Sequence, residues 1–137
     1  MNIHEFLSKS RIPTGERGTL SLAYIGDSVF QFLVKNMLLS SGDLPVAELN
    51  KRVNKLVCAS SQAEMYHKIK DILTDTELSV LKRGRNASTS SRAKHASVSD
   101  YRHATGIETL FGFLYLEGQI DRLLELFSII IIDYINF

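Results

Sequence analysis

Two carboxylates lie in segments of the sequence that are otherwise apolar. Asp27 lies in the run Leu-Ala-Tyr-Ile-Gly-Asp-Ser-Val-Phe, and Glu108 lies in the run Gly-Ile-Glu-Thr-Leu-Phe-Gly-Phe. A buried charge loses its water, so a carboxylate in such surroundings must pair with a cation or bind a metal. Two simpler alternatives stay open from the residues alone: each acid lies on the solvent edge of its helix, or it pairs with Lys35 or Arg102.

A glycine lies close to each acid. Gly26 directly precedes Asp27, and Gly106 comes two residues before Glu108. Glycine within a helix often marks a place where another backbone or a ligand comes very close. Both acidic segments are therefore candidates for close contact as well as for chemistry.

The positive charge of the chain is concentrated in one segment. The whole chain has 16 Lys and Arg against 15 Asp and Glu, a net charge of +1. Between residues 82 and 103, Asp100 is the one acid, and the basic residues are Lys82, Arg83, Arg85, Arg92, Lys94 and Arg102. This concentration favours an anionic partner there, although a solvated charged loop with no partner is the alternative.

The sequence around these residues predicts an all-α fold. The chain has only two prolines, and it shows neither a strand pattern nor an internal repeat. Apolar residues recur at three- and four-residue steps from about residue 20 to residue 39, behind Thr19 as the N-cap. A second apolar stripe follows Pro45, which suits the first turn of a helix.

Two capping-box patterns predict the next helices. Ser61 precedes Glu64 by three residues, and Thr74 precedes Glu77 by three residues. In a capping box the hydroxyl and the carboxylate satisfy the free N–H groups at a helix start. We therefore expect one helix to open at Ser61 and a short one to open at Thr74.

A loop is expected over residues 84–99. Ser, Thr, Ala, Lys and Arg dominate this stretch, in which Val98 is the only aliphatic side chain larger than alanine. A loop of about 15 residues is long enough to suggest a function. Helix is expected again from about residue 99 to Gly118, and a last helix carries Leu123 and Ile130.

Length and composition exclude several classes of protein. A chain of 137 residues suits one domain. Its single cysteine, Cys58, excludes an internal disulfide and a CxxC-type zinc site. No signal peptide is visible, and the apolar run over residues 126–132 is far shorter than the about 20 residues of a membrane span. We expect a soluble, cytoplasmic protein with no membrane partner.

The two acidic segments resemble those of the ribonuclease III family. Residues 22–29 are similar to the signature helix of that family, Leu-Glu-Phe-Leu-Gly-Asp-Ser/Ala-Val, and residues 104–112 are similar to its second acidic helix. Residues 82–87 and 99–105 resemble still more closely the Mini-ribonuclease III branch, which consists of the catalytic domain alone.

The resemblance spans about residues 20–117, with its motifs in the expected order. It implies the helical fold of the ribonuclease III endonuclease domain, a single catalytic domain over residues 1–137, and a homodimer. In a homodimer two sites can cut the two strands of a duplex.

The resemblance also implies that Asp27 and Glu108 are catalytic and bind Mg²⁺, for which Mn²⁺ can substitute. Full-length members have four acids in the two motifs. In this sequence Ala23 and Thr105 stand at the other two positions, which leaves the metal less tightly specified and the number of ions open.

The expected chemistry is hydrolysis of a phosphodiester. Two carboxylates, several waters and a substrate phosphate can complete an octahedral Mg²⁺ shell. The metal lowers the pKa of a bound water, which attacks the phosphorus and leaves 5′-phosphate and 3′-hydroxyl ends. Neither His67 nor His103 is needed as a base, and we expect both to be surface or packing residues.

Double-stranded RNA is the substrate that the resemblance implies, specifically the paired ends of precursor 23S ribosomal RNA. Duplex RNA is recognised through phosphates and 2′-hydroxyls, by shape more than by sequence. Basic side chains on a flexible loop suit that task, so we assign RNA binding to Lys82, Arg83, Arg85, Arg92 and Lys94. A large-subunit ribosomal protein is a further expected partner.

Two other functions are weighed against this one. Some proteins with the same fold lose the acids and act as duplex-binding ribosome-assembly factors. Ala23 and Thr105 move the sequence one step towards them, whereas Asp27 and Glu108 argue for an enzyme. A helical DNA-binding regulator would need a basic recognition helix after a short turn, but the basic residues lie mostly in the expected loop.

Overall fold

Six α-helices and one short 3-10 helix make up the part of the chain that the computed structural model describes, residues 18–87 and 97–135. No strand occurs in that part, so the predicted all-α class is confirmed. In chain order the elements are α2 (Thr19–Ser40), α3 (Val46–Val57), α4 (Ala59–Ile69), α5 (Asp75–Ala87), α6 (Val98–Leu116), α7 (Ile120–Ile131) and η3 (Ile132–Tyr134).

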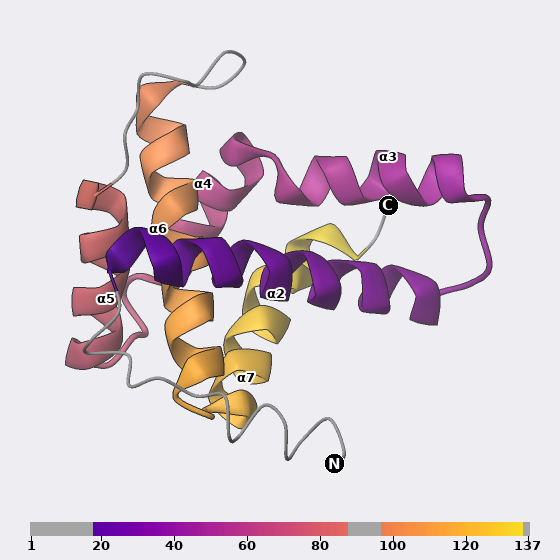
Figure 1. Ribbon diagram of the computed structural model, residues 1–137. Coiled ribbons are helices and arrows are strands. Elements are labelled where there is room, and N and C mark those ends of the chain that lie inside the picture. Colours follow the sequence, from indigo (N-terminus) through magenta and orange to yellow (C-terminus); the bar gives the residue numbers. More distant parts are fainter. Residues whose placement is uncertain (1–17, 88–96, 136–137) are drawn as a thin grey trace.

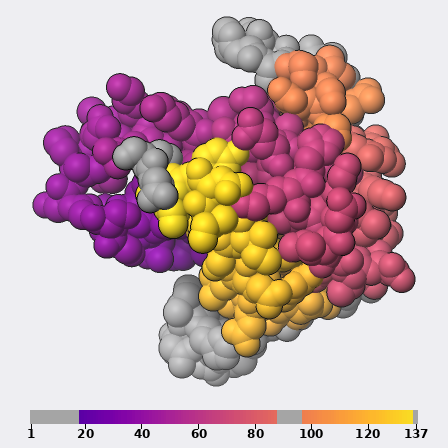
Figure 2. Space-filling view, turned by 180° about the vertical axis from the view of Figure 1, so that it is seen from behind, coloured from indigo at the N-terminus to yellow at the C-terminus, as the bar shows by residue number. Residues whose placement is uncertain are grey.

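Helix α6 is the central element. It packs against α2, α4, α5 and α7, and α2 crosses it steeply in Figure 1. From behind, α4 in magenta and α7 with η3 in yellow cover much of the surface (Figure 2). The core lies where these helices meet α6, and Phe30 of α2 packs edge-on against Phe111 of α6 with ring centroids 5.4 Å apart.

Glycines allow the helices to cross α6 with their backbones in contact. A methyl group on Gly26 would overlap the carbonyl oxygen of Glu108, and one on Gly112 would overlap the carbonyl oxygen of Leu22. On the other side of α6, a methyl group on Gly106 would lie 2.9 Å from the Leu81 carbonyl oxygen. The expectation of close contact at the two glycines is therefore confirmed.

One of the two predicted capping boxes is present. At the start of α5 the Thr74 backbone N–H donates to Glu77 Oε1 at 2.9 Å, and the Glu77 N–H donates to Thr74 Oγ1 at 3.2 Å. The prediction at Ser61 is wrong, because α4 already begins at Ala59. A single residue separates α3 from α4, and the Ser61 hydroxyl donates to the carbonyl oxygen of Lys55 at 2.6 Å.

The predicted loop over residues 84–99 is too long at both ends. Helix α5 continues to Ala87 because Gly84 is buried against α6, which supports the helix beyond that glycine. Helix α6 begins at Val98, where the Ser97 hydroxyl accepts a hydrogen bond from the Asp100 N–H at 3.0 Å. The remaining residues of the expected loop, 88–96, lie outside the described part.

None of the helices described here combines the length and the apolar character that a membrane span requires.

Candidate active site

The crossing of α2 and α6 brings the two predicted acids together. Asp27 follows Gly26, whose backbone lies against the backbone of Glu108. The Asp27 carboxylate acts electrostatically on the Glu108 carboxyl group. Both acids are half-buried, and the buried residues Ile107 and Thr109 flank Glu108 on α6.

The surroundings of Glu108 disfavour its charge. Burial raises the pKa of Glu108 to about 8, and the negative charge of Asp27 acts in the same direction. A hydrogen bond from the Gln62 side chain lowers the pKa but does not offset these two effects. When two carboxyl groups lie close together and are partly shielded from water, a bound cation stabilises the charged form of both.

Two glutamine side chains support the acids. Gln31, one helical turn after Asp27, donates from Nε2 to Asp27 Oδ1 at 3.1 Å. Gln62 of α4 donates to Glu108 and also, from Nε2, to the Val57 carbonyl oxygen at 2.9 Å. Neither glutamine was among the site residues predicted from the sequence. The available signal was the position of Gln62 on the buried stripe of α4, in helical register with apolar side chains.

The donor set at this crossing fits a hard divalent cation. Asp27 and Glu108 offer carboxylate oxygens, and the buried amide oxygen of Gln62 has no hydrogen-bond partner. Within residues 18–87 and 97–135, no group of three or more His, Cys, Asp and Glu side chains gathers that could hold a metal. A zinc site usually has three or four protein ligands, mostly Cys and His. Mg²⁺ accepts one or two carboxylates and keeps several waters.

Ala23 and Thr105 add no carboxylate to the pair. Both are buried, Ala23 on α2 and Thr105 on α6. The Thr105 hydroxyl donates to the Tyr101 carbonyl oxygen at 3.0 Å, within its own helix. The site therefore has two acids where the resemblance would supply four.

The basic residues assigned to a loop lie partly on a helix. Lys82, Arg83 and Arg85 belong to α5, so their assignment to a flexible loop is wrong. Lys82 and Arg83 are exposed, and the half-buried Arg85 donates from Nη1 to the Tyr66 hydroxyl at 3.1 Å. Helix α5 packs on α6, so these three residues lie on a helix of the bundle. Arg92 and Lys94 lie outside the described residues.

The two histidines pack against each other and against Tyr66. The imidazole centroids of His67 and His103 are 4.7 Å apart, and the Tyr66 ring meets His103 edge-on at 4.4 Å. Burial and the neighbouring His103 lower the pKa of His67. His67 is exposed and His103 is half-buried, which fits the expectation of surface or packing residues.

Comparison with known proteins matches both acidic helices to one family. A family model described as Ribonuclease III domain matches residues 20–119. The Mini-ribonuclease 3 of Brevibacillus brevis is 41% identical over 107 residues, which cover 78% of this chain and 80% of that protein. The Mini-ribonuclease 3 of Clostridium tetani is 40% identical over 113 residues, 82% of this chain and 75% of that protein.

A solved structure has a similar fold. The crystal structure of a Fusobacterium nucleatum protein superposes with a TM-score of 0.76 at 28% sequence identity, covering 85% of this chain and 93% of that one.

Proposed function

The chain belongs to the ribonuclease III family, and from that premise we propose that it is a Mg²⁺-dependent endoribonuclease that cleaves double-stranded RNA. The observation that carries this proposal is the meeting of two carboxylates at the α2–α6 crossing, where burial and mutual repulsion raise the pKa of Glu108 to about 8. Such a pair is costly to the fold unless a cation neutralises it.

Asp27 and Glu108 are the catalytic and metal-binding residues in this proposal. When bound, Mg²⁺, or Mn²⁺ in its place, supplies an activated water and offsets the charge of the scissile phosphate. The two carboxylates would hold the ion at the crossing, where the backbones of Gly26 and Glu108 are packed against each other. Hydrolysis leaves 5′-phosphate and 3′-hydroxyl ends.

Lys82, Arg83 and Arg85 on α5 bind the phosphates of the duplex, together with Arg92 and Lys94. Lys82 and Arg83 are exposed and available for this contact. Binding through phosphates depends strongly on salt and little on sequence. The natural substrate in this proposal is the paired ends of precursor 23S ribosomal RNA in the cytoplasm, with a large-subunit ribosomal protein as a further partner.

The active form is a homodimer, because one site of this kind cuts one strand. Helix α2 has a large apolar surface that supports the proposal: Tyr24 is 82% exposed and Phe32 is 68% exposed. Phe30, the third aromatic residue of this helix, is fully buried in the core and plays no part in it. Each copy contributes a single catalytic domain over residues 1–137.

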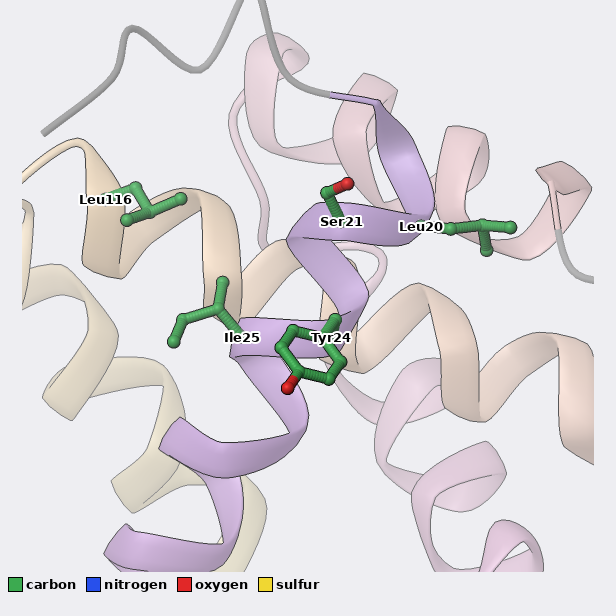
Figure 3. Close-up of a pocket in the computed structure, with 5 residues that line it drawn as sticks. All are labelled: Leu20, Ser21, Tyr24, Ile25 and Leu116. Atoms are coloured by element: carbon green, nitrogen blue, oxygen red, sulfur yellow. The ribbon is translucent and has the colours of Figure 1, made fainter.

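Figure 3 shows part of this apolar surface. The Tyr24 ring lies on the surface of α2, with Ile25 and the α6 residue Leu116 on one side of it and Leu20 on the other.

Sedimentation of the purified chain at micromolar concentration checks the dimer. A monomer with full cleavage activity would contradict it.

Cleavage of a long, perfectly paired RNA at low salt tests the enzyme. We expect defined fragments with Mg²⁺ and none with EDTA, and a loss of about 10³-fold or more in rate for Asp27→Asn, because a lost metal ligand removes several kcal/mol of transition-state stabilisation. Asp43→Asn is the matched control, since Asp43 is an exposed carboxylate outside the helices.

Intact RNA in every lane, with the duplex still bound, would instead support a non-catalytic assembly factor. That result would make Ala23 and Thr105 the marks of a lost activity.

A further inference from the structure

The orientation of the Gln62 side-chain amide follows from its contacts. Gln62 is 1% exposed, and its Nε2 donates to the Val57 carbonyl oxygen at 2.9 Å. The same side chain donates to the Glu108 carboxylate. The Val57 carbonyl oxygen can only accept a hydrogen bond, so the nitrogen end of the amide must face it, and the oxygen end faces other neighbours.

The oxygen end is left without a partner. Gln62 Oε1 is the one buried side-chain nitrogen or oxygen, among the residues described, that has no hydrogen bond. A buried acceptor left unpaired costs about 1–3 kcal/mol, and such atoms are rare in native proteins. This acceptor belongs to the same planar amide that contacts Glu108, so it lies close to that carboxyl group.

A hydrated cation would supply what this oxygen lacks. Mg²⁺ held by only two carboxylates keeps several waters, and each of these waters is a hydrogen-bond donor. Outer partners of this kind orient ligands at metal sites, and their loss commonly costs 10–100-fold in metal affinity or activity.

We propose that Gln62 is a positioning residue of the metal site, whose Nε2 holds the Glu108 carboxylate and whose Oε1 accepts a hydrogen bond from a water of the bound Mg²⁺. The inference rests on the proposed metal-dependent function. In a site with only two acids, the neutral amide of Gln62 on α4 would help to orient the water molecules bound to the ion.

Gln31 is the internal contrast. It also donates to a carboxylate, but it does so within its own helix and is half-buried. Solvent can replace its hydrogen bond to Asp27, whereas solvent is excluded from Gln62. The orientation of the metal shell therefore depends on Gln62 much more than on Gln31.

Mn²⁺ binding to the purified full-length chain tests the proposal. Gln62→Met keeps the length of the side chain and removes both hydrogen-bonding groups. We expect its dissociation constant for Mn²⁺, measured by electron paramagnetic resonance, to rise about tenfold or more. The Mg²⁺ concentration needed for half-maximal cleavage should rise with it, while duplex RNA binding in EDTA stays unchanged.

Thr109→Val is the matched control. Thr109 is fully buried and adjacent to Glu108, but its hydroxyl donates to the Thr105 carbonyl oxygen of its own helix at 2.7 Å. This variant loses a buried hydrogen bond without touching the carboxylates, so its Mn²⁺ affinity should match that of the unmodified chain.

A spectroscopic readout covers the case in which Gln62→Met fails to fold. The side-chain amide resonance of Gln62 in the ¹⁵N-labelled, unmodified chain should shift when Mg²⁺ is added. A static amide resonance at saturating Mg²⁺, or a folded Gln62→Met with Mn²⁺ affinity within twofold of normal, would overturn the inference and leave the proposed function intact. Absence of Mn²⁺ binding to the unmodified chain would overturn both.

Discussion

Glu77 and Glu108 are two glutamates of the same helical bundle, and their electrostatic surroundings have opposite effects on the carboxyl group. Glu77 accepts hydrogen bonds from Arg122 Nε and Nη2, both at 2.9 Å, and from the Thr74 N–H. These contacts, chiefly those of Arg122, lower the pKa of Glu77. Glu108 has Asp27 as its charged neighbour and a pKa raised to about 8.

This difference separates a carboxylate that stabilises the fold from the carboxylate to which we assign metal binding. Each oxygen of Glu77 has a donor from the protein, so its charge links α7 to the start of α5. Glu108 has one neutral donor, and burial together with the charge of Asp27 keeps its carboxyl group protonated at neutral pH when no cation is bound. The charged form of Glu77 is stabilised by the fold, whereas the charged form of Glu108 is destabilised. Such perturbed carboxyl groups are typical of binding sites.

The largest effect is expected from separating Glu108 from Asp27. Gly26→Ala places a methyl group on the Glu108 carbonyl oxygen, and a backbone atom cannot move aside as a flexible side chain can. We expect a loss of about 3 kcal/mol or more in the free energy of unfolding, because α2 and α6 must move apart. Urea denaturation measures the loss, and cleavage assays should find little activity in the remaining folded protein.

Gly18→Ala is the control for that substitution. Among the described residues, a methyl group on Gly18 meets only the Ser21 hydroxyl, at 3.9 Å. Gly18, and not the predicted Thr19, is the N-cap of α2. Alanine is a poorer N-cap than glycine, so we expect a change below about 1 kcal/mol. Equal losses in the two variants would contradict the account of the crossing.

The next effect concerns the paired glutamate. Glu77→Gln leaves the Arg122 charge partly buried without its main partner, so we expect a loss of about 3 kcal/mol at pH 7. Because the folded-state pKa of Glu77 is lowered, its contribution is present above the ordinary glutamate pKa and is lost as pH falls through the folded-state value. Urea midpoints from pH 7 down to pH 3 should therefore converge for the variant and the unmodified chain.

Glu125→Gln is the matched control on the same arginine. Glu125 is an exposed partner of Arg122, one turn further along α7. Exposed pairs contribute little, so we expect a change below about 1 kcal/mol. A larger loss from Glu125→Gln than from Glu77→Gln would contradict the structural role of Glu77.

Much of the helical framework could be predicted from the sequence, because periodicity and caps are local. The Thr74–Glu77 capping box and the helix carrying Asp27 depend on residues within a few positions of each other. The continuation of α5 past Gly84 could not be predicted, since it depends on contact with α6. Gln62 was missed for the same reason, because its importance comes from Glu108, 46 positions away in the sequence.

A smaller effect of opposite sign is expected at the unpaired glutamate. With EDTA at pH 8, Glu108→Gln should be more stable than the unmodified chain by about 2 kcal/mol. A pKa shift of one unit corresponds to about 1.4 kcal/mol, and structural relaxation around the charged carboxylate reduces the energy calculated from the full shift. Because the pKa of Glu108 is raised to about 8, its stabilising contribution is complete below the ordinary glutamate pKa and is lost as pH rises towards 8.

Urea midpoints at pH 5 and pH 8 check this prediction, and the advantage of Glu108→Gln should shrink at pH 5. Excess Mg²⁺ should reverse the order at pH 8, because an ion that binds only the folded state of the unmodified chain stabilises that state. The same midpoint difference at both pH values would show that Glu108 is not held in its neutral form.

The smallest effect should come from Thr74, which supports Glu77 from the capping box. Thr74→Ala removes the hydroxyl that accepts the Glu77 N–H but keeps the Thr74 N–H that donates to Glu77 Oε1. We expect a loss of about 1 kcal/mol, the usual cost of an N-cap. The Arg122 pair should persist, so the acid-side pH dependence of urea midpoints should be nearly unchanged. If that dependence disappeared with Thr74→Ala, the low pKa of Glu77 would belong to the cap and not to the arginine.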